Sequence, residues 1–464
     1  MSDFHGIVPE EDSVKAFWAN FRSHAFNSVR GVLTNRMVST ACRVAQWKYR
    51  VRCLSPVLVI LHMVLAAIWP EESFAASWNV LWASANAQHA DDRTEVHPPS
   101  SGSLAKARQR IPLAVWQYVL DAITQRAANL GTELDHWRGL RLIQVDGTCL
   151  SMPAEDALFK AFGTCNSRGK KGRFPLARAV VLTLARSRTV FAYALGGYKD
   201  GEVALLRQLL PTLKPDALLI ADRLYASAYA YILYRATGAH FITRVHQRLN
   251  IQALRPLHIY NSTDFIVDLP LGPMHRRRFP ELPKTIRIRL IRVTLRGRKG
   301  METSWLATSL LDAKAYPADE IAQRYAERWS VETRIREFKI DLSADVLRSK
   351  TVDGVRKEVM ARVVAMNVIT VLMLEAALDA DVDPRRISFV QTLRTVLSFA
   401  PGFAYHAPAT LPRLYRCMLH EIARNLVPLR SNRLEPRAIR REKKHYPSLK
   451  TTRAEWRRSH GCAA

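Results

Sequence analysis

The chain has 464 residues, of which 48% are hydrophobic, and its 69 lysines and arginines outnumber 41 aspartates and glutamates to give a net charge of +28. Its length exceeds one ordinary domain, so we expect roughly two or three, and its composition is that of a globular protein with a sizeable core. The positive charge favours nucleic acid or an anionic membrane surface as a partner over a merely solvated basic surface.

The cysteines and the apolar segments exclude several classes of protein. Six cysteines lie far apart without a CxxC pair, which excludes an obvious structural zinc site and a dense disulfide framework and suits a reducing cytosol. The most apolar stretch, residues 57–69, is too short to span a bilayer, so we expect a buried helix there between Pro56 and Pro70. Lacking a signal sequence as well, the chain is expected to be cytoplasmic, with nucleic acid rather than a membrane as its partner.

The first part of the chain is predicted to be helical. Apolar residues recur at helical spacing over residues 12–86, and a polar stretch with a Pro pair and a Ser run, residues 89–102, predicts a linker. Another helical stretch, basic at its start, covers residues 104–130. We therefore expect a helical N-terminal domain at 1–95 and a linker with a basic helix at 96–139.

The pattern then becomes mixed α/β. The predicted order is strand, hairpin, helix, strand, helix and strand, which places an antiparallel hairpin beside parallel strands. The predicted elements are, in chain order, strand 140–145, hairpin 177–185 with 189–195, helix 201–210, strand 217–221, helix 227–237 and strand 239–245.

The remainder of the chain is predicted to hold β-rich, helical and basic parts. Residues 247–301 are strand-like and basic, and long helices are predicted at 317–342 and 355–378. The predicted α/β domain thus comprises 140–246 and 302–395, with a β-rich insertion at 247–301. Residues 396–464 form a C-terminal helical segment with a basic tail.

Two aspartates follow apolar strands. Asp146 comes after LRLIQV, and Asp222 comes after ALLIA. In open α/β sheets, functional sites form where strand ends meet loops. Each aspartate also has an ordinary structural explanation, because Asp-Gly is a common turn dipeptide and Asp222 could cap the next helix.

The predicted helix from Pro317 supplies a third carboxylate. Tyr325, Arg328, Glu332 and Lys339 fall within about 60° of one another around a helix of about 100° per residue. The ordinary interpretation is a solvent-facing stripe with an Arg328–Glu332 pair worth a few tenths of a kcal/mol. A carboxylate flanked by cations also suits a phosphate site in which Glu332 binds metal and the two cations meet phosphate oxygens.

These residues resemble a known family, the DDE transposases of bacterial insertion sequences in the "insertion sequence four" branch. That branch is marked by Tyr, two residues, Arg, three residues, Glu, six residues and Lys, which is the spacing found here. Its first aspartate lies in Asp146-Gly147-Thr148, and its second lies in Asp222-Arg223-Leu-Tyr225. The family resemblance also includes two dipeptides, Phe162-Gly163 and Phe174-Pro175, and the segment Trp305-Leu-Ala-Thr-Ser-Leu. It covers about residues 100–380.

The resemblance implies an RNase H-like catalytic domain with a β-rich insertion, preceded by a helical N-terminal domain, residues 1–95, that recognises the terminal-repeat DNA. It implies that Asp146, Asp222 and Glu332 are catalytic and hold two Mg²⁺ or Mn²⁺ ions, since such hard ions prefer carboxylate oxygens. One ion would activate water, or later a 3′-hydroxyl, and the other would stabilise the leaving oxygen. No covalent protein–DNA intermediate is then needed.

The resemblance also implies a set of DNA contacts. They are Tyr325, Arg328 and Lys339 at phosphates near the scissile bond, with Arg223 beside the second aspartate. Trp305 lies where relatives stack an aromatic ring on a base pulled from the duplex, and a core tryptophan is its equally weighted alternative. Two basic stretches, 168–173 and 276–299, are either phosphate contacts or soluble surface.

Three functions remain open from the sequence. The first is an active transposase that cuts double-stranded DNA at the inverted repeats of its own element and joins it to target DNA, as a homodimer on paired ends in the bacterial nucleoid. The second is a catalytically retired DNA-binding descendant, against which the presence of all three carboxylates argues. The third is another RNase H-like nuclease, against which the Tyr-Arg-Glu-Lys stripe argues.

Overall fold

The structure is a computed structural model that describes residues 26–50, 53–88, 97–167, 170–297, 300–428, 451 and 453–460. The described residues form two compact units. The first, called here the helical unit, comes from Met1–Leu130, Ser151–Pro175 and Glu337–Ala464, and the second, the sheet unit, comes from Gly131–Leu150 and Leu176–Arg336. Each unit is described by itself.

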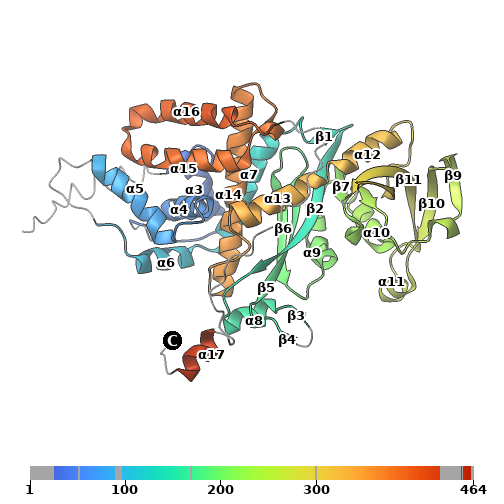
Figure 1. The fold of residues 1–464 in the computed structure, drawn as a ribbon, viewed down its shortest axis with the longest axis horizontal. Helices are drawn as coiled ribbons and strands as arrows, with labels where there is room; N and C mark the ends of the chain where they lie inside the picture. Colours follow the sequence, from blue (N-terminus) through green and yellow to red (C-terminus); the bar gives the residue numbers. More distant parts are fainter. Residues whose placement is uncertain are drawn as a thin grey trace, which may run out of the picture. The chain divides into compact units, whose positions relative to one another are not determined.

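The helical unit is organised around one long apolar helix. This helix, α14 (Val352–Asp379), runs through the middle of the unit in Figure 1 and packs against helices from both ends of the chain. Its main neighbours are α4 (Pro56–Ile68), α7 (Leu113–Leu130), α15 (Phe389–Tyr405) and α16 (Leu411–Arg424). By length and composition α14 could cross a membrane, and 94% of its most apolar window is buried by other parts of the chain.

The remaining elements of the helical unit are shorter. The helices are α2 (Asn27–Arg30), α3 (Asn35–Val44), α5 (Phe74–Gln88), α6 (Ser101–Arg110), α8 (Asp156–Phe162) and α17 (Arg453–Ser459), with 3₁₀ turns η5 (Pro384–Arg386) and η6 (Pro408–Thr410), the π-helical segment η4 (Glu337–Asp341) and the small hairpin β3 (Asn166–Ser167) and β4 (Lys170–Lys171). The predicted buried helix after Pro56 is confirmed as α4, whose N-cap Ser55 accepts a hydrogen bond from the Leu58 amide. The predicted helix 104–130 is wrong in one respect, because it divides into α6 and α7 just before Pro112.

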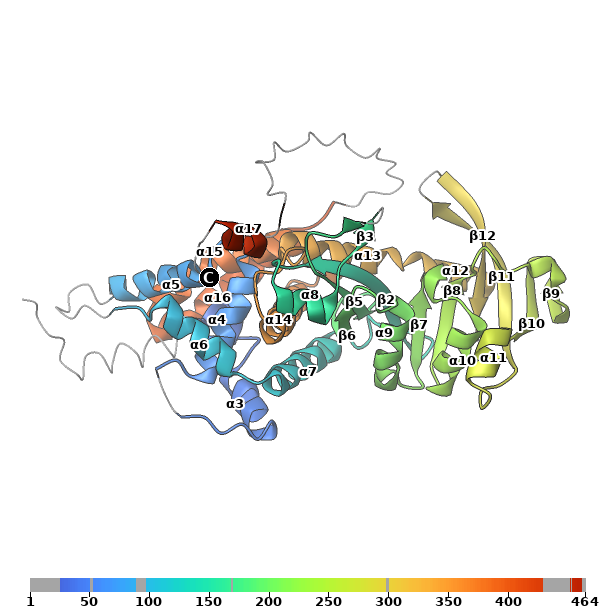
Figure 2. The ribbon, with the colours of Figure 1, turned by 90° about the horizontal axis from the view of Figure 1, so that it is seen from below.

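The sheet unit contains a ten-stranded mixed sheet, whose strand order is β6-β5-β2-β7-β8-β12-β11-β10-β9, with β1 paired to β2. Figure 2 shows β9 to β12 at the end of the sheet far from β5. The strands are β1 (His136–Trp137), β2 (Leu140–Ser151), β5 (Leu176–Leu184), β6 (Val190–Gly197), β7 (Ala217–Ala221), β8 (His240–Arg244), β9 (Pro256–Asn261), β10 (Asp264–Pro270), β11 (Thr285–Gly297) and β12 (Gly300–Thr308).

The strands of the predicted mixed α/β segment form the first half of this sheet. β5 and β6 are an antiparallel hairpin, while β2, β7 and β8 are parallel neighbours. Helices α9 (Glu202–Leu209) and α10 (Ala228–Ala236) and the 3₁₀ turns η1 (Leu210–Thr212) and η2 (Arg223–Tyr225) connect them. The prediction of a mixed α/β fold is therefore confirmed. All of β7 and residues 142–145 of β2 are buried, as is typical of parallel strands in the middle of a sheet.

The β-rich residues that follow extend the same sheet. β12 pairs with β8 and β11, and β10 joins β11 to the edge strand β9, while the short helix α11 (Pro273–Arg278) and the turn η3 (Ile251–Ala253) lie between strands. Arg289 on β11 and Asp264 on β10 form a buried bidentate ion pair in this extension, with Nη2 to Oδ2 at 2.5 Å and Nε to Oδ1 at 2.7 Å.

Two sequence-based predictions about local structure are wrong. The first strand does not stop at Val145, because β2 continues through Asp146 and Gly147 to Ser151, so this Asp-Gly pair is not a turn. The long helix after Pro317 is not continuous. It consists of α12 (Ala318–Ala326), α13 (Trp329–Arg336) and the π-helical η4. The residues of the predicted stripe therefore do not share one continuous helix, and Lys339 lies in the π-helical segment.

Candidate active site

The two predicted aspartates lie at one edge of the sheet because their strands are parallel neighbours. The last residue pair between β2 and β7 is Gln144 with Ile220. Asp146 lies two residues after Gln144, and Asp222 lies two residues after Ile220. Asp146 is half-buried within β2, and Asp222 is half-buried at the N-cap of the turn η2. The parallel register therefore brings the two carboxylate-bearing positions to the same end of adjacent strands.

Local hydrogen bonds orient both aspartates in the same way. Oδ1 of Asp146 accepts from the Gly147 amide at 2.8 Å, and Oδ1 of Asp222 accepts from the Arg223 amide at 2.6 Å. The predicted capping role of Asp222 is thus real, and it engages only one carboxylate oxygen. Each aspartate has its second oxygen, Oδ2, available for another ligand, since no hydrogen bond to it is found within the described residues.

A partly buried hydrogen bond joins the strand of Asp146 to the helix of Glu332. The Ser330 hydroxyl donates to Oε1 of Gln144 at 2.6 Å, across 186 residues of sequence. The Gln144 amide in turn donates to the carbonyl of Glu327 at 2.8 Å. Gln144 and Ser330 stand two residues before Asp146 and Glu332, so this pair of bonds fixes the start of α13 against β2 and sets where Glu332 lies along the strand.

Arg328 lies among the three carboxylates. The residue is 7% exposed, and its guanidinium donates to Oε1 of Glu332 at 2.8 Å. It also interacts electrostatically with Asp146 and with Asp222. Burial works against the charge of Arg328, but Tyr325, Glu332 and Asp222 together hold the pKa of its guanidinium above the ordinary value. One buried cation therefore interacts with all three predicted acids, and the ordinary interpretation of a solvent-facing Arg328–Glu332 pair does not describe it.

The environment of Asp146 disfavours its negative charge. Burial is the main cause that raises the pKa of Asp146 to about 6, and the nearby Glu332 and Glu202 add to the effect. The Gly147 amide and Arg328 act in the opposite direction. A bound divalent cation would offset both burial and repulsion, so the charge balance of this site suits such an ion.

The donor set also suits a hard divalent ion. Asp146, Asp222 and Glu332 offer carboxylate oxygens, which Mg²⁺ and Mn²⁺ prefer. Within the part of the chain that the structure describes, no group of three or more His, Cys, Asp or Glu side chains is already arranged around one point as metal ligands. Arg328 instead supplies positive charge to the site, through its ion pair with Glu332 and its electrostatic interaction with the two aspartates.

The predicted DNA-contact residues have different surroundings. Tyr325 is 6% exposed, within the apolar core cluster of the sheet, and burial raises the pKa of its hydroxyl to about 12. Arg223 is exposed, with Nη1 at 3.4 Å from Oε1 of Gln247. Trp305 is half-buried on β12, where its ring packs edge-on against Phe265 at 5.5 Å between centroids. Lys339 is half-buried in η4 of the helical unit.

The two basic stretches are only partly consistent with phosphate binding. Residues 168–169 and 298–299 lie outside the described residues, as do 429–450 of the basic tail. Arg289 is buried against Asp264 and Arg287 is paired with Asp268, so both serve the sheet. Residues 276–278 on α11 are exposed and remain candidates for phosphate contact.

Three residues of the site were missed by the sequence interpretation: Gln144, Ser330 and Glu202. Gln144 was the most conspicuous signal, because it is the one amide in the strand LRLIQV and it is fully buried. A buried polar side chain needs a partner, and that requirement alone could have pointed to a distant hydrogen bond. Ser330 and Glu202 carry no such signal in the sequence.

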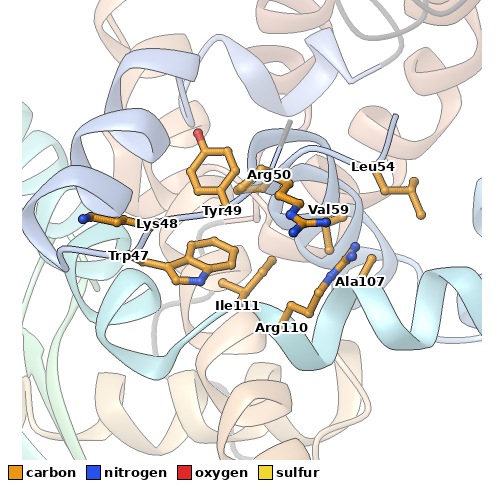
Figure 3. A pocket seen from close by; sticks show the side chains of 10 residues that line it. Trp47, Lys48, Tyr49, Arg50, Leu54, Val59, Ala107, Arg110 and Ile111 are labelled. Carbon is orange, nitrogen blue, oxygen red and sulfur yellow. The ribbon is translucent and has the colours of Figure 1, made fainter. Parts of the chain in front are cut away.

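The helical unit contains a pocket with aromatic and basic walls. It has a volume of about 240 Å³ and lies between the segment before α4 and the end of α6. Figure 3 shows the rings of Trp47 and Tyr49 on one side and the guanidinium ends of Arg50 and Arg110 close together on the other. The two rings lie 5.0 Å apart, Tyr49 is 41% exposed, and no acidic residue lines the pocket.

The chain is similar to a known protein family and to two transposases of Escherichia coli. The family described as "Transposase DDE domain" matches residues 137–368. The chain is 26% identical over 351 residues to transposase InsG for insertion sequence element IS4 of Escherichia coli (strain K12), covering 75% of this chain and 78% of InsG. It is 25% identical over 142 residues to the putative transposase InsZ of the same organism, covering 30% of this chain and 46% of InsZ.

A solved structure is also similar. The piggyBac transposase synaptic complex with hairpin DNA aligns with 88% of this chain and 86% of that chain, at 9% identity and a TM-score of 0.41. The family match covers half of the chain, including Asp146, Asp222 and Glu332. The protein belongs to the DDE transposases of the IS4 family.

Proposed function

We propose that this protein cuts DNA at the ends of its insertion sequence and joins those ends to target DNA, using Asp146, Asp222 and Glu332 to hold two divalent cations. The single observation that supports this most strongly is that one buried cation, Arg328, interacts with all three carboxylates. The strand order β6-β5-β2-β7-β8, with its hairpin beside three parallel strands, supports the RNase H-like catalytic domain that the family resemblance implies.

The roles of the individual residues follow from their positions. When bound, the cations would activate the attacking oxygen and stabilise the leaving oxygen at phosphorus. Asp146 and Asp222 would hold the cations through their Oδ2 atoms, while the amide bonds to Oδ1 keep the carboxylates oriented. Ser330 and Gln144 would keep Glu332 in place. Arg328 would contact a phosphate oxygen when a cation takes over part of its interaction with the acids.

The reaction needs two phosphoryl transfers. In the first, water attacks the phosphodiester at the element's end, the bond from phosphorus to the 3′ oxygen breaks, and a 3′-hydroxyl is released. In the second, that hydroxyl attacks a target phosphodiester, and the target's own 3′ oxygen leaves. Neither step needs a nucleophilic side chain, and the acids act by binding cations and orienting the reacting groups.

The test is cleavage of duplex DNA carrying the element's terminal repeats, at a fixed salt concentration. We expect single-strand breaks at the repeat ends with Mg²⁺ or Mn²⁺ and none with EDTA. RNA–DNA hybrids and four-way junctions of equal length serve as control substrates and should remain uncut. Preferential cutting of either control would contradict the proposal, and specific binding to the repeats without any cutting would favour a retired DNA-binding protein instead.

The pocket of the helical unit is a candidate contact with the terminal-repeat DNA. Arg50 and Arg110 carry two fixed positive charges beside the rings of Trp47 and Tyr49. Cations bind backbone phosphates, and aromatic rings stack on bases or pack on sugars. This placement refines the expectation that the N-terminal residues, 1–95, recognise the repeat.

Alanine at both Arg50 and Arg110 is expected to weaken binding to the terminal repeat. The slope of the logarithm of the binding constant against the logarithm of the salt concentration should fall in magnitude by about 2, one unit for each phosphate that is no longer neutralised. The measurement is fluorescence anisotropy between low and moderate salt. Arg36→Ala, an exposed arginine on α3 outside the pocket, is the matched control. Equal slopes for the double variant and the wild type would remove the pocket from the DNA-binding surface.

A further inference from the structure

A fourth carboxylate lies beside the first catalytic aspartate. Glu202 begins helix α9, and its side chain packs directly against the backbone of Gly147. A Cβ added at Gly147 would lie 2.3 Å from both Cδ and Oε2 of Glu202. Gly147 is not among the glycines with a positive φ, so its backbone conformation does not demand glycine. A side chain after Asp146 would instead have to displace the Glu202 carboxylate from its place.

A tyrosine close to the second aspartate in the sequence holds Glu202 in position. The hydroxyl of Tyr225, three residues after Asp222, donates to Oε2 of Glu202 at 2.8 Å. Tyr225 is 1% exposed, and its own carbonyl accepts a hydrogen bond from the Tyr234 hydroxyl at 3.0 Å. A buried and doubly anchored donor therefore holds the Glu202 carboxylate where it is.

These contacts link the two aspartate segments through one acid. Glu202 touches the residue after Asp146 and bonds to a residue of the turn that Asp222 caps. Its charge is among the causes that raise the pKa of Asp146. A glutamate in the first turn of a helix is favourable on its own, because it complements the helix dipole. That favourable position does not require the side chain to press against Gly147 or to accept from a buried tyrosine.

We propose that Glu202 is a fourth carboxylate of the cation site, held in place by Tyr225, and that it helps Asp146 and Asp222 to bind the divalent ions. Gly147 and Tyr225 then have assigned roles: one leaves space for this carboxylate, and the other positions it. The inference rests on the proposed function, since it concerns the same cations.

The first experiment measures Mn²⁺ binding to the full-length protein without DNA, by electron paramagnetic resonance of the free ion. Glu202→Gln keeps the size of the side chain and an oxygen acceptor for Tyr225, but removes the charge. We expect it to weaken Mn²⁺ binding about tenfold without lowering the midpoint of thermal unfolding. Tyr225→Phe should weaken Mn²⁺ binding less, by up to about fivefold, because the Glu202 carboxylate remains but loses its hydrogen-bond donor. Glu281→Gln, an exposed acid of the same unit, is the control and should bind as the wild type does.

The outcomes separate this inference from the proposed function. If the wild type binds Mn²⁺, Asp222→Asn loses the binding, and Glu202→Gln binds like the wild type, then Glu202 has only a structural role and the inference fails alone. If the wild type and Asp222→Asn bind equally, the proposed cation site fails and the inference fails with it. A loss of thermal stability in Glu202→Gln without a change in Mn²⁺ affinity would also overturn the inference.

The second experiment tests the packing and does not depend on ions. Gly147→Ala should lower the midpoint of thermal unfolding, because the added methyl meets the Glu202 carboxylate. Shortening the acid with Glu202→Ala in the same chain should recover at least half of that loss. If the two substitutions are additive instead, Glu202 does not occupy the space beside Gly147, and the proposal is overturned even where the single variant is too unstable for ion binding to be measured.

Discussion

Replacing Asp222 with asparagine is expected to reduce metal-dependent cleavage of terminal-repeat DNA on the order of 10³-fold or more. Asparagine retains the carbonyl oxygen that can accept from the Arg223 amide, so the local turn should persist. It removes the negative charge with which the site would hold a cation. Asp146→Asn and Glu332→Gln are expected to have effects of similar size, because residues that hold one reacting centre act as a unit.

The measurement is the initial rate of strand nicking at saturating DNA and fixed Mg²⁺, compared with the wild type. Binding to the same DNA should be retained, since the basic surface is unchanged. Glu281→Gln again provides an exposed acid of the same unit as control and should cleave at the wild-type rate. If cleavage remained metal-dependent and near the wild-type rate in all three site variants, the assignment of these carboxylates would be wrong.

The second large effect concerns stability. Asp264→Ala is expected to lower the free energy of unfolding of the sheet unit by about 3–5 kcal/mol. The side chains of Arg289 and Asp264 are only 1% and 5% exposed, and Arg289 also donates to the carbonyl of Tyr316 at 2.7 Å. Removing the aspartate would leave a buried guanidinium without its carboxylate, and the cost of that uncompensated charge dominates the effect.

The same pair of strands offers a matched control. Arg287 and Asp268 pair on β11 and β10 as well, but their side chains are 58% and 33% exposed. Asp268→Ala should therefore cost less than about 1 kcal/mol. Replacing both Asp264 and Arg289 with apolar residues of similar volume should recover most of the stability. Urea unfolding followed by circular dichroism measures all three. Equal losses for Asp264→Ala and Asp268→Ala would show that burial does not distinguish the two pairs.

Much of the local structure could be predicted from the sequence, because the pattern of apolar residues reflects which face of an element is buried. The strands ending near Ala221 and Arg244, the hairpin β5–β6 and the long helix α14 lie close to their predicted bounds. The spacing of the family signature likewise predicts Asp146, Asp222 and Glu332 as the catalytic acids. Residue type and spacing suffice for this, since they are properties of short stretches of chain.

The tertiary structure decided how these residues are held. The bond between Gln144 and Ser330 joins positions 186 residues apart, and the contact of Glu202 with Gly147 depends on where helix α9 meets strand β2. Pairing with distant strands also allowed the β-rich residues to extend the sheet instead of forming a separate layer. Periodicity and spacing carry no information about such contacts, because they depend on which surfaces meet once the chain has folded. For that reason the sequence identified the candidate acids, whereas only the folded chain placed Arg328 among them and Glu202 beside them.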